Sequence, residues 1–292
     1  MPGNVLAALV SPFTDFVFMQ HALLGCLALS LSAPPVGVFL MLRRMSLTGD
    51  AMAHAILPGA AIGYLVAGLS LGAMTLGGLV AGLAVVAASG WVSRTTLLRE
   101  DTSLAAFYLM SLALGVVIIS SQGRNVDLLH VLFGSVLALD RAAVAFLGGV
   151  AATTLTTLAL LYRPLVLECL DPGFLRAVSR WSPVAHYGFL ALLVLNLVAG
   201  FQALGTLLAV GMMILPAAIA RLWVRELKRL LAVAVVVCAV GSVVGLILSY
   251  HLEMPSGPGI VLTLGGFYLL SLLAGPRGAV RARRVPALHL KA

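Results

Sequence analysis

One segment of the chain, RRMSLTGDAMAHAILPGAAIG at residues 43–63, combines residue types that could bind a metal ion. Asp50 and His54 are four residues apart, so on a helix their side chains share one face. Pro58 follows at the same spacing, and because proline has no backbone N–H, the carbonyl of His54 loses its helical partner. A carboxylate, an imidazole and a carbonyl oxygen are all ligands for a divalent ion. This face therefore predicts a divalent-metal site.

Asp50 and His54 also have a plainer interpretation. Asp50 follows Gly49 near the start of an apolar run, where it could cap a helix, and His54 could make a structural hydrogen bond. Ionisable groups within an apolar run are costly, however, and usually face a cavity or a pathway. The sequence leaves both interpretations open.

Other polar residues give weaker signals. The pairs Asp127 with His130 and His251 with Glu253 are expected to be solvated at the ends of apolar runs, although the second pair could help pass a cation inward. Whether either pair contacts an ion stays open.

Three residues in later apolar runs are expected to have structural roles. His186 is predicted to lie at an interface, and Asn196 to make a helix–helix hydrogen bond. Pro216 frees the carbonyl of Met212 and could kink its helix, as Pro58 could in the first segment.

The composition places these residues in a membrane protein. The chain has 292 residues, of which 61% are hydrophobic and 10% are charged. A soluble domain carries about 25% charged and about 45–50% apolar residues. So large an apolar excess has no interior to fill unless part of it faces lipid. We therefore predict one all-α domain, a polytopic bundle of transmembrane helices.

Eight or nine runs are long enough to span a bilayer, since a span needs about 20 mostly apolar residues. The candidates are 17–41, 47–69, 72–93, 103–121, 142–162, 184–203, 205–222, 229–250 and 257–275. The sixth and seventh are separated so narrowly that they could be a tight hairpin or one broken element. This organisation gives an extracytoplasmic N-terminal segment (1–16), a transmembrane domain (17–275) and a basic cytoplasmic tail (276–292).

The basic residues predict the orientation of these spans. With the N-terminus outside and nine spans, only Arg124 and Arg141 of the 18 Lys and Arg residues fall outside. The net charge of +8 therefore reflects membrane topology. No basic patch with interleaved aromatic residues suggests a nucleic-acid partner.

Two connections are too long for simple turns. The outer one, residues 122–140, contains LLHVLFGSVLAL, which is too short to span and predicts a re-entrant or interfacial helix. The inner one covers residues 163–181.

The inner connection has features of a docking helix. Asp171 as N-cap and Pro172 at the first helical position predict where that helix begins. Phe174 and Leu175 would offer a partner protein an apolar contact. The alternative is that aromatic residues here only anchor the loop at the lipid interface.

Several kinds of site are missing from the sequence. The three cysteines, Cys26, Cys169 and Cys238, are isolated and suggest neither a disulfide framework nor a thiolate metal site. No GxxxxGK[ST] loop, HExxH motif or nucleophile elbow occurs. We therefore expect no enzyme and no permanently bound cofactor, and any ATP must be bound by another chain.

The metal-binding segment belongs to a recognisable pattern. LRRMSLTGDAMAHAILPGAAIG resembles the hallmark segment of zinc/manganese ABC transporter permeases, except that Ala53 stands where Ser is frequent. LLHVLFGSVLALD, LVLECLDPGFLRAVS and VAGFQALGTLLAVGMMILPAAIAR resemble the outer re-entrant, cytoplasmic coupling and paired-helix segments of the same family. The resemblance implies a type II ABC importer fold, like that of cobalamin and iron–siderophore importers.

This resemblance also implies partners and a cargo. It implies a homodimer in a bacterial inner membrane, a cytoplasmic ABC ATPase subunit and an extracytoplasmic metal-binding protein. It implies that Asp50 and His54 contact the transported metal, for which zinc is favoured and manganese comes next. The alternatives are an ion-coupled secondary transporter, which should have ionisable residues deep in several spans, and an intramembrane enzyme, which needs a fuller catalytic cluster.

Overall fold

The computed structural model describes residues 12–68, 70–97, 100–121, 136 and 139–278. In this part of the chain, nine helices are long and apolar enough to span a membrane. They are α2 (Val17–Leu42), α3 (Ser46–Ala67), α4 (Leu71–Thr95), α5 (Glu100–Ser121), α7 (Arg141–Leu160), α10 (Ser182–Leu204), α11 (Thr206–Trp223), α12 (Leu227–His251) and α13 (Ser256–Ala274). Two shorter helices, α8 (Tyr162–Leu170) and α9 (Pro172–Val178), join α7 to α10.

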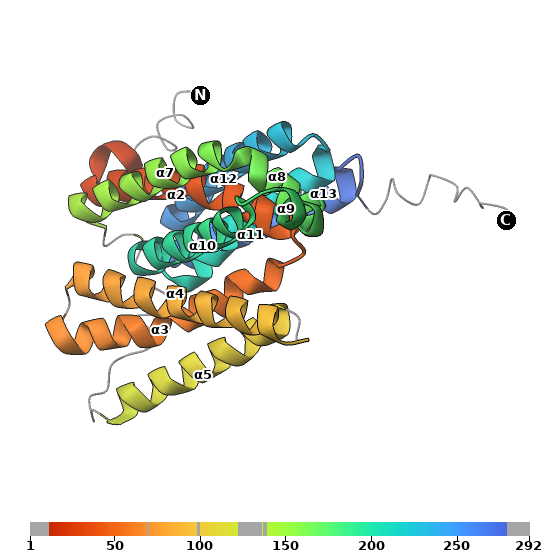
Figure 1. The fold of residues 1–292 in the computed structure, drawn as a ribbon. Coiled ribbons are helices and arrows are strands. Elements are labelled where there is room, and N and C mark those ends of the chain that lie inside the picture. Colours follow the sequence, from red (N-terminus) through yellow and green to blue (C-terminus); the bar gives the residue numbers. More distant parts are fainter. Residues whose placement is uncertain (1–11, 69, 98–99, 122–135, 137–138, 279–292) are drawn as a thin grey trace.

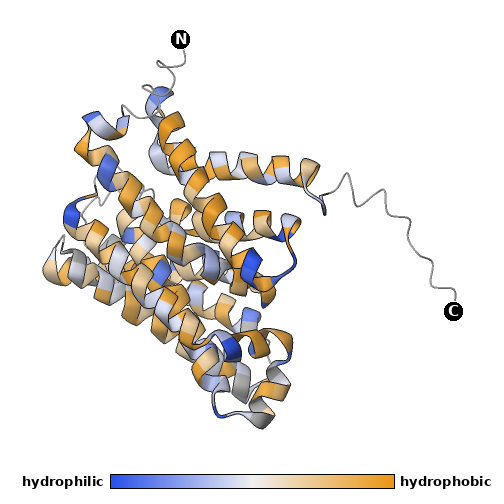
Figure 2. Ribbon diagram, turned by 90° about the horizontal axis from the view of Figure 1, so that it is seen from above, coloured by the Kyte–Doolittle hydropathy of each residue, from blue (hydrophilic) through white to orange (hydrophobic). Residues whose placement is uncertain are grey.

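The predicted all-α membrane bundle is thus confirmed, with nine candidate spans in the described residues. Hydrophobic residues dominate the helices, and the most hydrophilic positions lie mainly near helix ends and in connections (Figure 2). The outer segment with Asp127 and His130 lies outside the described residues, as do most of the N-terminal segment and of the basic tail.

A single glycine separates the sixth and seventh spans. Gly205 ends α10 with a φ of 93°, a conformation that only glycine adopts without strain. Its N–H still bonds to the carbonyl of Phe201, and α11 starts at the next residue. Gly200 of α10 packs against Ala209 of α11 across this break. The two runs are therefore separate helices joined by the single residue Gly205.

The helices fall into two groups (Figure 1). α3, α4 and α5 form one side of the molecule, and α10 packs against both α3 and α4. On the other side of α10 lie α2, α7, α11, α12 and α13. α2 and α10 are the most buried of the spans and α5 is the least, so the core lies around α2 and α10.

Glycines let α3 and α4 approach until their backbones touch. A Cβ on Gly59 would overlap the carbonyl oxygen of Gly77, and a Cβ on Gly77 would overlap that of Gly59. Farther along, a Cβ on Gly63 would overlap the carbonyl of Ala73. Small residues at such crossings are what allow close helix packing in lipid. They fix the position of α3, which carries Asp50 and His54.

Asn196 makes the helix–helix hydrogen bond that the sequence predicts, and the carbonyl of Met212, four residues before Pro216, also contacts another span. Asn196 of α10 donates from Nδ2 to Thr154 Oγ1 of α7 at 2.8 Å. Pro216 lies within α11, and the carbonyl of Met212, which cannot bond to a proline nitrogen, accepts from the Cys238 thiol at 3.6 Å. Both of these contacts join two different spans.

The helix predicted in the inner connection also forms. α9 begins at Pro172, and Asp171 caps it by accepting from the Phe174 N–H at 2.9 Å. The two apolar residues that follow have different environments. Phe174 is 54% exposed, whereas Leu175 is only 3% exposed. Leu175 therefore holds α9 against the rest of the chain, and Phe174 is left facing outward.

Candidate functional site

The two predicted metal ligands lie on α3, past its first turn. The helix begins at Ser46 with Met45 as its N-cap residue, and no side chain caps it. Asp50 is therefore inside the helix, and the interpretation of Asp50 as a helix cap is wrong. The carboxylate of Asp50 is therefore not used to cap α3 and remains available to bind a ligand.

Asp50 and His54 face the same direction and are accessible. His54 Nε2 lies 4.0 Å from Asp50 Oδ1, and the side chains are 38% and 68% exposed, respectively. Leu47 and Leu65 are exposed at helical spacing on this same face. This face of α3 therefore presents an imidazole and a carboxylate within an otherwise apolar surface.

The pair is an incomplete ligand set. Among the described residues there is no cluster of three or more His, Cys, Asp or Glu side chains that could hold a metal ion. A structural zinc site has four protein ligands and a catalytic one has three. Two ligands can contact a passing divalent ion without enclosing it.

The neighbouring helix α5 supports α3 one turn beyond His54. α3 continues through Pro58 as one helix, and Gly115 of α5 packs directly on the proline ring. Ser111 of α5 donates its hydroxyl to the carbonyl of Ala55 at 2.9 Å. These contacts fix the part of α3 in which proline interrupts the backbone hydrogen bonding.

A cavity of about 430 Å³ adjoins the face of α3 that carries Asp50 and His54. It lies between the start of α3 and the start of α5, and Asp50, Asp101 and Tyr108 are among the residues that line it. Asp101 brings a second carboxylate into the space beside Asp50. Asp101 was not among the candidates predicted from the sequence. The one feature that could have pointed to it is its position as an acidic residue just before the fourth predicted span.

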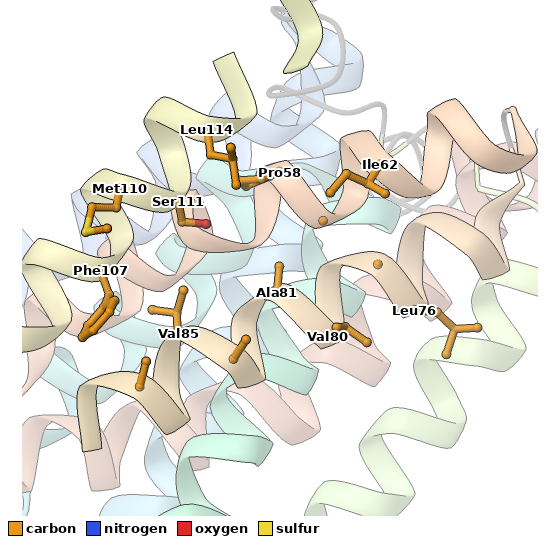
Figure 3. Close-up of a pocket in the computed structure, with 14 residues that line it drawn as sticks. Pro58, Ile62, Leu76, Val80, Ala81, Val85, Phe107, Met110, Ser111 and Leu114 are labelled. Atoms are coloured by element: carbon orange, nitrogen blue, oxygen red, sulfur yellow. The ribbon is translucent and has the colours of Figure 1, made fainter. Parts of the chain in front are cut away.

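A larger groove of about 710 Å³ lies between α3, α4 and α5 (Figure 3). Its labelled lining includes Pro58 and Ile62 of α3, Val80 and Val85 of α4, and Phe107 of α5. The one hydroxyl in the lining, that of a serine in α5, already donates to a backbone carbonyl. This groove therefore lacks ligands for a cation, and the candidate site is confined to the end of α3 that carries Asp50.

The remaining candidates lie apart from this face. His251 and Glu253 are both exposed at the end of α12, where Glu253 has a φ of 53°. His186, which the sequence predicts to be interfacial, is enclosed by protein side chains. It is buried with Arg43 and Glu168, because three helices close over these side chains.

Comparison with known proteins connects this geometry to a family. The profile of the ABC 3 transport family matches residues 15–275. The manganese import system permease protein ScaB of Streptococcus parasanguinis is 33% identical over 273 residues, which cover 94% of this chain and 96% of that protein. The chelated iron transport system membrane protein YfeD of Yersinia pestis is 30% identical over 285 residues, covering 98% and 95%.

Solved structures show the same arrangement of helices. PsaBC from Streptococcus pneumoniae, determined in complex with Fab, matches with a TM-score of 0.82 and 31% identity, over 96% of this chain and all of that one. A metal-chelate type ABC transporter in an inward-facing conformation matches with a TM-score of 0.67 over 91% of this chain and 86% of that one. At 17% identity, the second match supports the fold alone.

Proposed function

This chain belongs to the ABC 3 transport family and is a multi-pass permease of the bacterial plasma membrane, and from that premise we propose that it carries Mn²⁺ into the cell past Asp50 and His54. The observation that supports this role most is the open carboxylate–imidazole pair on α3. An importer must release its cargo, so a pair of ligands that cannot enclose the ion suits transport better than a closed site.

Manganese is favoured over zinc because of the relatives. Permeases named for manganese or iron transport resemble this chain over nearly its whole length. Carboxylate and imidazole ligands suit Mn²⁺, Fe²⁺ and Zn²⁺ alike. Zinc, which the family resemblance alone favours, therefore stays a prediction that the competition assay below tests.

A second copy of the chain would complete the pathway. Asp50 and His54 are exposed on a span, yet an ionised side chain in contact with lipid costs at least about 2.5–3.5 kcal/mol. If two copies bring their α3 faces together, both pairs gain a polar environment and the ion gains twice as many ligands. This arrangement is the homodimer implied by the family resemblance.

The energy for transport would enter through α9. The chain has no nucleotide-binding loop, so a cytoplasmic ABC ATPase subunit has to bind it. Phe174, exposed beside the Asp171 cap and Pro172, is an apolar residue available for that contact. An extracytoplasmic metal-binding protein would deliver the ion on the other side.

Uptake measurements with site variants test the proposal. Cells that express the chain with its partner subunits should accumulate radioactive manganese, and Asp50→Ala or His54→Ala should reduce accumulation at least tenfold. Glu226→Gln is the control, because Glu226 forms only an exposed pair with Arg229. Unlabelled manganese should compete at lower concentrations than unlabelled zinc.

Each result has a definite meaning. Normal uptake in both site variants, at normal expression, would remove Asp50 and His54 from the pathway. Uptake that does not depend on the ATPase subunit would favour a secondary transporter. Stronger competition by zinc than by manganese would show that zinc, the metal favoured by the family resemblance, is the transported ion.

A further inference from the structure

Three ionisable side chains meet in the interior where α2, α8 and α10 converge. The side chains of Arg43, Glu168 and His186 are 6%, 2% and 7% exposed. Ser182 at the start of α10 donates its hydroxyl to Glu168 Oε2 at 3.2 Å. We call Arg43, Glu168, His186 and Ser182 the buried cluster. The metal pathway as described so far does not use it.

Arg43 is the centre of the buried cluster. Its Nη2 atom lies 3.5 Å from Glu168 Oε1 and 3.3 Å from His186 Nδ1. Arginine can only donate, so at this distance the imidazole nitrogen is the acceptor. The guanidinium also lies over the ring of Phe189, 4.8 Å from its centroid. One side chain therefore holds both α8 and α10.

Arg43 lies at the junction between α2 and α3. Arg43 is the C-cap residue of α2, directly after its last helical residue, and α3 begins just after the turn that follows. Glu168 lies in the last turn of α8, just before Asp171 caps α9. The ion pair therefore connects α8, which leads directly into α9, to the turn from which α3, with Asp50 and His54, begins.

We propose that Arg43 and Glu168 are positioning residues for transport, which transmit the movement of α8 and α9 to α3. This inference rests on the proposed function, since it assumes that an ATPase moves α9. Separating a buried ion pair leaves uncompensated charge, which is strongly unfavourable. The α2–α3 turn therefore follows α8 when α8 moves, whereas apolar contacts alone would let the two slide.

One atom of the buried cluster is not satisfied in this conformation. Nη1 of Arg43 is buried and has no hydrogen-bond partner among the described residues. A buried donor without a partner is unfavourable, so a conformation that gives Nη1 an acceptor would gain stability. An unsatisfied donor of this kind is expected in a contact that rearranges during the transport cycle. It is not expected in a contact that only stabilises the packing of three helices.

Transport by the reconstituted complex with its ATPase provides the test. The quantity to measure is manganese transported per ATP hydrolysed, in liposomes that contain equal amounts of assembled complex. We expect Glu168→Gln to lower this ratio at least tenfold while the ATPase subunit stays bound and continues to hydrolyse ATP. Glu226→Gln is the matched control, since it removes the same charge from an exposed pair.

Arg43→Lys provides a second variant in case Glu168→Gln does not fold. It keeps the buried charges balanced, but one ammonium cannot hold Glu168, His186 and the Phe189 ring at once. Its ratio should fall as well, and Arg229→Lys in the exposed pair is its control. If either folded variant transports the wild-type amount of manganese per ATP, or loses only its bound ATPase, the proposal is wrong. If the wild-type complex itself shows no ATP-driven transport, the proposed function fails instead.

Discussion

Two pairs of a carboxylate and an imidazole in this chain differ mainly in their surroundings. Asp50 and His54 are 4.0 Å apart on an exposed face of one helix. Glu168 and His186 are 3.6 Å apart, but they come from two helices and share an arginine in the interior. The charge of the second pair is already neutralised by Arg43, so only the first pair is available to a cation.

The comparison teaches that residue type alone does not identify a metal ligand. Both pairs have the chemistry of a divalent-metal site. The positive guanidinium beside Glu168 occupies the position that a metal ion would need, and three helices keep water away. The exposed pair binds no such partner among the described side chains, so its function depends on what passes along α3.

The largest effect expected from this contrast is on stability. Glu168→Gln leaves Arg43 buried without its counter-charge and should lower the free energy of unfolding by about 3–5 kcal/mol. Asp50→Asn changes an exposed side chain and should alter it by less than about 0.5 kcal/mol. Denaturant unfolding of the purified chain in detergent measures both. Equal losses in the two variants would show that the two pairs are equivalent after all.

A second contrast lies within α9, where the side chain of Phe174 is exposed and that of its neighbour Leu175 is buried. Phe174→Asp should leave the fold intact and weaken binding of the ATPase subunit by about 3 kcal/mol, roughly 100-fold, because it places a carboxylate in an apolar contact. Pull-down of the ATPase in detergent measures the effect. Leu97→Asp, at an exposed residue after α4, is the control. Unchanged recovery with Phe174→Asp would mean that this ring only anchors the loop at the lipid interface.

The surface that presents the open pair depends on the crossing of α3 and α4. Gly77→Ala would force the two backbones apart and should destabilise the protein by about 1–3 kcal/mol, with reduced uptake. Gly72→Ala on the same helix meets no atom and is the matched control. Thermal unfolding and manganese uptake in the two variants check this prediction. If Gly77→Ala behaves like Gly72→Ala, the close crossing does not position the face of α3 that carries Asp50 and His54.

The smallest expected effect concerns the thiol beside the buried cluster. Burial raises the pKa of the Cys169 thiol above its ordinary value, and the nearby Arg43 only partly offsets this. Less thiolate is therefore present near neutral pH, and maleimide should label Cys169 a few-fold more slowly than an exposed cysteine. Leu97→Cys in a Cys169→Ser background supplies that reference. The rate at Cys169 should keep rising at a pH where the reference has levelled off, and coincident pH profiles would contradict this.

The spans could be predicted because lipid imposes a length and a composition on each of them. The sixth run, predicted at 184–203, became Ser182–Leu204, and the short helix after Asp171 was found from its cap and its proline. These features depend on residues close together in sequence. Asp50 and His54 could be paired for the same reason, since helical spacing alone places them on one face.

The buried cluster could not be predicted, because its members are far apart in the sequence. Arg43 looked like one more basic residue of an inner loop, and His186 like an interfacial histidine. Their contact arises only when α2, α8 and α10 pack together. The exposure of Asp50 and the burial of Leu175 likewise depend on tertiary packing, which helical spacing does not reveal.

The arginine–glutamate contact also affects how this sequence can drift over generations. Losing either Arg43 or Glu168 first leaves a buried charge unpaired, so single substitutions there are expected to be removed wherever selection keeps the protein folded. Asp50 and His54 have no such protection, because little of the fold depends on them. In a descendant that keeps the folded protein for another purpose but has stopped importing metal, we therefore expect the exposed pair to mutate early, while the arginine and the glutamate persist or change together.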